Sequence, residues 1–157
     1  MACPYSESDR WKYVSSWLPA AVHILSFLPE CQSTSGLSKR LSLPENRILA
    51  IQEDLLRMGL LEKSGSLYRP SVRQIHFPPN SDFARRQHAN WRTESARRVL
   101  EDPLDERLRF TNVICASKKD LAEFRAKIEN VVAEFGKKIA ASPEEEVTLF
   151  LCDFLSL

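Results

Sequence analysis

Residues 55–71 read LLRMGLLEKSGSLYRPS, and this stretch decides the fold. A helix is expected to end at Gly59, because glycine readily adopts the left-handed conformation that closes a helix. Two short strand-like segments, 60–63 (LLEK) and 67–70 (LYRP), then flank the turn residues 64–66, a pattern that predicts a tight β-hairpin. Helix, glycine stop and hairpin in this order are typical of the end of a winged-helix domain.

The residues upstream supply the helices that such a domain needs. Apolar side chains recur at helical spacing from residue 11 to 28, and Pro29 ends the pattern. A short helix capped by Ser35 is expected next, followed by a second helix start at residues 42–44. One face of that second helix is apolar and carries Ile48, Ile51, Leu55 and Met58. We therefore predict a winged-helix domain over residues 11–71.

The sequence after residue 71 predicts two further segments, and the chain as a whole is expected to have an α+β fold. Residues 72–106 form a connector and a long arginine-rich helix that Ser81 or Asp82 caps. Residues 107–157 are expected to form a β-α-β module, with strands over 108–116 and 146–154 around a helix over 118–140. Two strands do not hold a sheet alone, so we expect pairing with the winged-helix portion or with a second copy of the chain.

The net charge of +1 conceals an uneven distribution along the chain. Residues 35–100 hold twelve Lys/Arg and six Asp/Glu, a net charge of +6, whereas residues 101–157 carry −4. A basic middle beside an acidic end is typical of a polyanion-binding segment joined to a different module. The alternative is that solvated helical faces differ in sign by chance.

If the winged helix binds duplex DNA, its third helix should enter the major groove. Asn46 could then hydrogen-bond adenine and Arg47 guanine. Glu53 and Asp54 lower the positive charge of the same helix, so contact with a protein partner, or dimerisation, stays open as the other use of this surface. The residues expected over phosphates are Lys39, Arg40, Lys63 and Arg69.

A second basic surface is expected on the long middle helix. It could follow a nucleic-acid backbone, with Phe83 and Trp91 available for base stacking. We favour another interpretation, in which Trp91 packs between the two halves and the arginines are solvated or paired with the acidic C-terminal unit. The residues concerned are Arg85, Arg86, Arg92, Arg97 and Arg98.

The sequence does not predict an enzyme, a metal site or a cofactor. His88 has no Ser or Cys partner at a motif spacing, and His23 and His76 form no ligand pattern with it. With only four glycines, a Gly-rich phosphate loop is not expected. None of the four cysteines belongs to a CxxC pair, and we expect buried structural thiols, notably at two positions in strand-like runs, Cys115 and Cys152.

A cytoplasmic location without membrane insertion is expected. Glu7 and Asp9 lie where a signal peptide would carry positive charge. The apolar stretch 17–28 contains a proline and a histidine and is too short to span a bilayer.

Four segments together resemble an uncharacterised bacterial domain family: WKYVSSWLPAAVHIL (11–25), residues 55–71, RRQHANWRTESARRVLEDPLDERLRF (85–110) and FLCDFLSL (150–157). The family is similar to the C-terminal half of transcriptional regulators of the Fibrobacter–Bdellovibrio type. The chain departs from it in lacking the N-terminal helix-turn-helix half and in its last residues. Positions that match the family pattern are Trp17, Gly59, His88, Arg107 and Phe154.

The sequence thus predicts a non-enzymatic protein that is similar to a bacterial transcriptional regulator. Its winged helix would bind DNA, and its C-terminal module would dimerise or sense a signal, giving a homodimer. The alternative is an interaction or scaffold module whose winged helix contacts protein.

Overall fold

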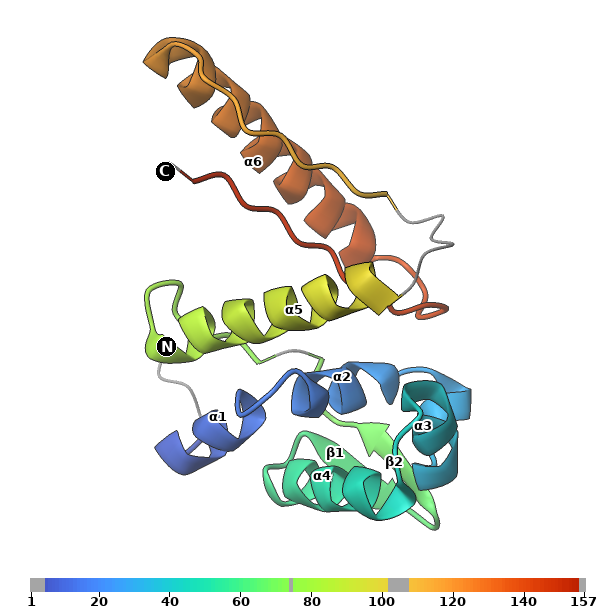
Figure 1. The fold of residues 1–157 in the computed structure, drawn as a ribbon. Helices are drawn as coiled ribbons and strands as arrows, with labels where there is room; N and C mark the ends of the chain where they lie inside the picture. Colours follow the sequence, from blue (N-terminus) through green and yellow to red (C-terminus); the bar gives the residue numbers. More distant parts are fainter. Residues whose placement is uncertain (1–4, 74, 102–107, 156–157) are drawn as a thin grey trace. The chain divides into compact units, whose positions relative to one another are not determined.

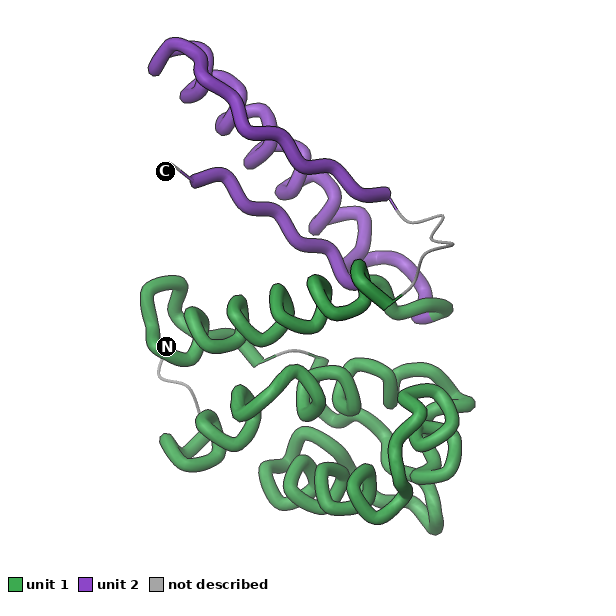
Figure 2. Tube along the Cα trace, in the orientation of Figure 1, with its two compact units in different colours: residues 1–103, 145–148 green, residues 104–144, 149–157 purple. Residues whose placement is uncertain are grey.

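The computed structural model describes residues 5–73, 75–101 and 108–155. The chain divides into two compact units (Figure 2): unit 1 contains residues 1–103 and 145–148, and unit 2 contains residues 104–144 and 149–157. Within the described ranges the fold is α+β, with six α-helices and one two-stranded antiparallel sheet (Figure 1).

Unit 1 begins with two short helices where the sequence predicted one, α1 (Glu7–Tyr13) and α2 (Leu18–Leu25). The single helix over 11–28 is wrong because Pro19 lacks a backbone N–H, and its ring would clash with the carbonyl group four residues earlier. At the second position of α2 the same proline fits, since the first turn has no partner for that N–H.

The next helices follow a short 3-10 turn, η1 (Pro29–Cys31). They are α3 (Thr34–Leu41) and α4 (Glu45–Arg57). Ser33, rather than Ser35, caps α3: its Oγ accepts a hydrogen bond from the Gly36 N–H at 3.0 Å. Ser42 links the two helices in a left-handed conformation with φ of 53°. The predicted end of α4 is confirmed, because Gly59 follows it with φ of 73°.

The predicted hairpin is also confirmed. Strand β1 (Leu61–Ser64) pairs antiparallel with β2 (Leu67–Pro70), and Gly65 between them has φ of 62°. A further contact was not predicted: Ser33 forms an isolated antiparallel bridge with Leu67, and Gln32 accepts the N–H of Tyr68 at 2.7 Å. The segment before α3 therefore lies beside the hairpin as a very short third extended segment.

Helix α5 (Asp82–Glu101) matches the predicted long helix and completes unit 1. Trp91 is half-buried against the core, with its ring 6.0 Å from that of Trp17, so it packs within this unit. The core is lined by α1, α2, α3, α4, the hairpin and the first turn of α5. Its buried members include Tyr13, Val14, Val22, Leu37, Ile48, Leu55, Leu60, Tyr68 and Phe83.

Unit 2 is built on α6 (Lys118–Ala140), as predicted, with Ser117 accepting the N–H of Asp120 at 3.1 Å. The two predicted strands are wrong: the described residues of 108–116 and 146–154 form no strand. A strand exists only where a neighbouring backbone completes its hydrogen bonds, and β1 and β2 pair with each other. The β-α-β module is thus not formed within the described chain.

The missing strands also explain a wrong prediction about two thiols. Cys115 and Cys152 are exposed, although the sequence predicted buried cysteines, while Cys31 is buried in unit 1. Cys115 and Cys152 lie on extended segments that are not part of a sheet, so no sheet face covers these two thiols. Cys3 and Arg107 lie outside the described residues.

Candidate nucleic-acid interface

Side-chain hydrogen bonds fix α3 and α4 relative to each other. Thr34 Oγ1, in the first turn of α3, donates to Oε1 of Gln52, which is fully buried in α4, at 2.6 Å. Ser38, in the second half of α3, donates from Oγ to the carbonyl oxygen of the linker residue Leu43 at 2.6 Å, and the Leu43 N–H returns a bond to the Ser38 carbonyl. These bonds therefore join α3 both to α4 and to the linker that precedes it.

The exposed face of α4 begins with the two predicted base-contacting residues. Asn46 and Arg47 lie in its first turn and are both exposed. The same helix also exposes Glu45 and Glu53, and Leu49 is 42% exposed. The face is therefore polar and close to neutral, with a single arginine at its N-terminal end.

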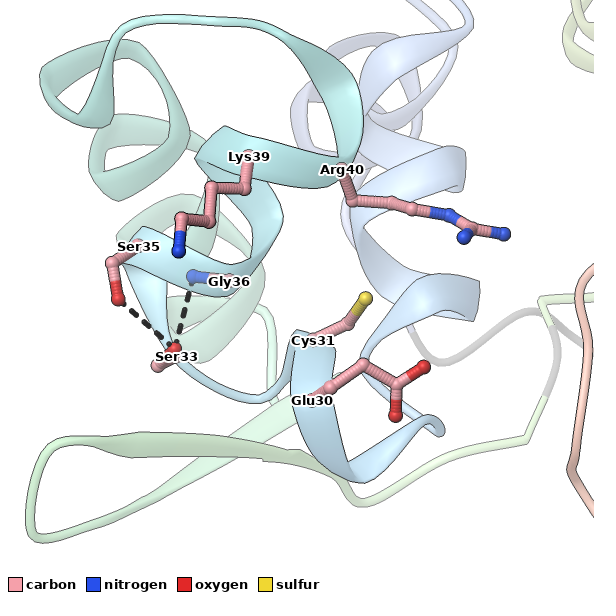
Figure 3. Close-up of a pocket in the computed structure, with 7 residues that line it drawn as sticks. All are labelled: Glu30, Cys31, Ser33, Ser35, Gly36, Lys39 and Arg40. Atoms are coloured by element: carbon pink, nitrogen blue, oxygen red, sulfur yellow. Dashed lines mark hydrogen bonds between the residues drawn. The ribbon is translucent and has the colours of Figure 1, made fainter.

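The predicted phosphate-contacting pair on α3 borders an open pocket of about 460 Å³ (Figure 3). The Lys39 side chain lies over the capped start of α3, whereas that of Arg40 points away from it past Cys31. A carboxylate, Glu30, is also part of the lining, so the two cations are not concentrated on one anion site. The lining consists of Glu30, Cys31, Ser33, Ser35, Gly36, Lys39 and Arg40.

Lys63 is engaged with α4. Its Nζ lies 3.3 Å from Glu53 Oε1 and 4.8 Å from the centroid of the Tyr68 ring. The Tyr68 hydroxyl donates to the same carboxylate oxygen, and this bond, followed by the one from Lys63, lowers the pKa of Glu53. Sequence reasoning missed the cluster because residues 15 positions apart share no periodicity. Arg69, opposite Glu62 in the hairpin, is exposed.

The predicted second basic surface on α5 is largely neutralised by neighbours within the helix. Arg97 and Arg98 contact the buried carboxylate of Glu94 at 2.8 and 2.7 Å. The Arg97 bond is the main reason that the pKa of Glu94 is lowered. Arg85 pairs with Asp82, in the first turn of the helix. The ion pairs of Arg85, Arg97 and Arg98 described here are thus with carboxylates of α5 itself.

The remaining two arginines of that surface differ from each other. Arg92 donates to the backbone oxygen of His88 at 3.1 Å, and Arg86 is exposed. Phe83 is buried and stacks on Phe77 with ring centroids 5.7 Å apart, so it is not available to stack on a base.

The described residues contain no group of three His, Cys, Asp or Glu side chains placed to hold a metal ion. His23 is fully buried, with Nε2 2.7 Å from the Val72 carbonyl oxygen, whereas His76 and His88 are exposed. Of the helices in the described ranges, none combines the length and apolar character that a bilayer crossing requires.

Comparison with known proteins identifies one family for this chain. No curated protein and no solved structure matches the chain. A family model described as a domain of unknown function, DUF4423, matches residues 6–157. Because the match extends over both units, the chain belongs to the DUF4423 family.

Proposed function

We propose that unit 1 is a winged-helix domain that binds duplex DNA in a bacterial transcriptional regulator acting in the cytoplasm. The observation that carries the proposal is the bridge between Ser33 and Leu67. With it, the chain order becomes helix, short extended segment, two helices and hairpin, which is the order of a winged helix. The sequence also resembles the C-terminal halves of bacterial regulators, and this resemblance supports the architecture more than the function.

In this proposal α4 is the recognition helix. Its exposed N-terminal turn carries Asn46 and Arg47, the residue types that hydrogen-bond adenine and guanine in the major groove. The exposed cations Lys39, Arg40 and Arg69 would contact phosphates, which set position rather than sequence preference. Lys63 is paired with Glu53 of α4, so its main role in this proposal would be to stabilise the hairpin against α4, and contact with a phosphate would be secondary.

The test is a titration of duplex DNA with the full chain, followed by fluorescence anisotropy between about 50 and 200 mM salt. Lys39→Ala should lower the salt slope by about 1, because one phosphate contact is lost. Arg47→Ala should weaken binding to a selected sequence by about 1–3 kcal/mol. Arg85→Ala is the control, since Arg85 pairs within α5. Binding that is undetectable at low salt, or equally weakened by the control, would contradict the proposal.

A second function is favoured by one observation. Leu49 is 42% exposed on α4, between Glu45 and Glu53, and a near-neutral face with an apolar centre suits a protein partner better than a phosphate backbone. In that case Leu49→Ser abolishes partner binding, and the salt titration with DNA shows nothing. For unit 2 we propose a role in dimerisation or signal sensing.

A further inference from the structure

Unit 2 has the apolar composition of a core but does not bury it. In the described residues of this unit no side chain of α6 is buried. Val131 and Phe135, in the apolar stripe of α6, are 65% and 51% exposed. The large apolar side chains exposed in the unit are Leu108, Phe110, Val113, Ile114, Phe124, Val131, Val132, Phe135, Ile139, Leu149, Phe150, Phe154 and Leu155.

The exposed area is far larger than an isolated domain tolerates. An aromatic side chain buries roughly 150–250 Å² on packing, so these side chains expose on the order of 1,000 Å² per copy. Monomeric proteins rarely expose an apolar patch larger than about 600 Å². A stable protein interface takes about 800 Å² from each partner, so the area meets what a dimer needs.

The extended segments beside α6 specify the kind of partner. Phe150 and Phe154 contact α6 through Phe135 and Phe124, with ring centroids 6.3 and 5.8 Å apart. The backbone of 149–155 and of 108–116 forms no ladder within the described chain. Such edges are completed by another strand.

A second copy of the same chain would account both for the exposed apolar side chains and for the extended segments that form no ladder. Two copies of one extended segment can pair antiparallel across a two-fold axis, where the backbone of each forms a ladder with that of the other. Charge does not oppose the contact: the described residues of unit 2 hold seven Lys/Arg and six Asp/Glu. On α6, Arg125 and Glu129 neutralise each other at 2.8 Å.

We propose that unit 2 is the self-association element of this protein: a second copy covers the apolar stripe of α6 and pairs with its flanking extended segments. The inference rests on the dimerising role proposed for unit 2 and is independent of DNA binding by unit 1. It also assigns a role to the segments that the sequence predicted as strands, which would become strands on association.

The experiment compares two neighbouring substitutions in the full chain. Val131→Glu places a charge in the apolar stripe, whereas Asn130→Glu adds the same charge about a quarter-turn further round, on the polar side of α6. Light scattering after size exclusion should give twice the 18.0 kDa chain mass for the native protein and for Asn130→Glu. Val131→Glu should give the mass of one chain.

A second readout covers the possibility that Val131→Glu perturbs α6. Cys115 is exposed on its segment, as is Cys152, and Cys31 is buried in unit 1, so a protein carrying both Cys3→Ser and Cys152→Ser reports on association through maleimide labelling of Cys115. Labelling of Cys115 should slow as the concentration of the native protein rises and stay fast in Val131→Glu. Circular dichroism should show equal helix content in both glutamate variants.

Three results would overturn the inference: a native protein with the mass of one chain, a Val131→Glu dimer, or Cys115 labelling that is independent of concentration. DNA is absent from all of these measurements. A dimer that does not bind DNA therefore contradicts only the proposed function, and a DNA-binding monomer contradicts only the assignment of unit 2.

Discussion

The hydroxyl group of Tyr13 donates a hydrogen bond to Nδ1 of His23 across 3.1 Å in the core of unit 1. The direction follows from the other ring nitrogen. The Val72 carbonyl oxygen, 2.7 Å from Nε2, can only accept, so Nε2 carries the proton and Nδ1 is the acceptor. The contact thus joins α1, α2 and the connector after the hairpin through one neutral imidazole.

This neutral histidine predicts a loss of stability in mild acid. Burial lowers the pKa of His23 below its usual 6.5, so the unfolded chain takes up a proton first as the pH falls. The stabilising contribution of neutral His23 is complete above pH 6.5. As the pH falls below 6.5, the free energy of unfolding should decrease by up to about 1.4 kcal/mol per pH unit. Urea unfolding between pH 7.5 and 5.5 measures it through tryptophan fluorescence, since all three tryptophans lie in unit 1.

His23→Gln should flatten this dependence on pH even if it lowers stability at every pH. His88→Gln should retain it, because His88 is exposed. A native protein whose stability is constant across this interval would contradict a buried neutral His23. The carboxylates with lowered pKa values, such as that of Glu94, titrate below the usual 4.5 and do not enter this window.

Glu94 predicts a large effect from a small change on α5. It is the buried acceptor for Arg97 and Arg98, and the Arg98 guanidinium lies 5.5 Å from the Trp17 ring centroid. Glu94→Ala should lower the free energy of unfolding by about 1–3 kcal/mol, because it removes charge-assisted hydrogen bonds at a site that is partly shielded from solvent. Glu101→Ala is the control, since its pair with Arg97 is exposed and should change stability by less than about 1 kcal/mol. Equal effects in urea titrations would count against this role.

Two glycines predict opposite results from the same substitution. A Cβ on Gly36 would lie 2.0 Å from the Glu30 carbonyl oxygen, and Gly36→Ala should cost about 1–3 kcal/mol as η1 is displaced. A Cβ on Gly136, inside α6, would meet nothing within 4 Å. Gly136→Ala should therefore stabilise its helix by up to about 1 kcal/mol. Thermal unfolding followed by far-UV circular dichroism distinguishes them, and a stabilising Gly36→Ala would show that η1 and α3 are not in close contact.

Ser42 predicts a stabilising substitution between α3 and α4. Its φ of 53° is costly for a residue with a Cβ, so Ser42→Gly should raise the free energy of unfolding by up to about 1 kcal/mol. Ser42→Ala retains the strain and should leave stability nearly unchanged. A destabilised glycine variant in urea would mean that the serine side chain contributes more than its backbone costs.

The helices and the hairpin were predictable because their signals are local. The bounds of α6 follow from the cap at Ser117 and from a stripe that repeats every three or four residues. The end of α4 follows from Gly59. In both cases the residues that determine the structure lie within one turn of the place where they act.

The strands of unit 2 and the candidate interface were less predictable, because their geometry depends on distant partners. Alternation around Phe110 and Phe150 indicates which side chains share a face, but a strand also needs a neighbouring backbone. The arginines of α5 suggested a basic surface, and the i+3 and i+4 spacing of Glu94 relative to Arg97 and Arg98 could have indicated their neutralisation.

Ser33 joins two elements that would otherwise be separate, since one residue both caps α3 and pairs with Leu67. The hairpin should therefore tolerate inserted residues at its tip but not at the end beside Ser33. Additional residues at its tip, between Gly65 and Ser66, would lengthen the loop and leave both attachments in register. One residue inserted beside Ser33 would shift the cap and the bridge together, so loop grafting and peptide-tag insertion belong at the tip.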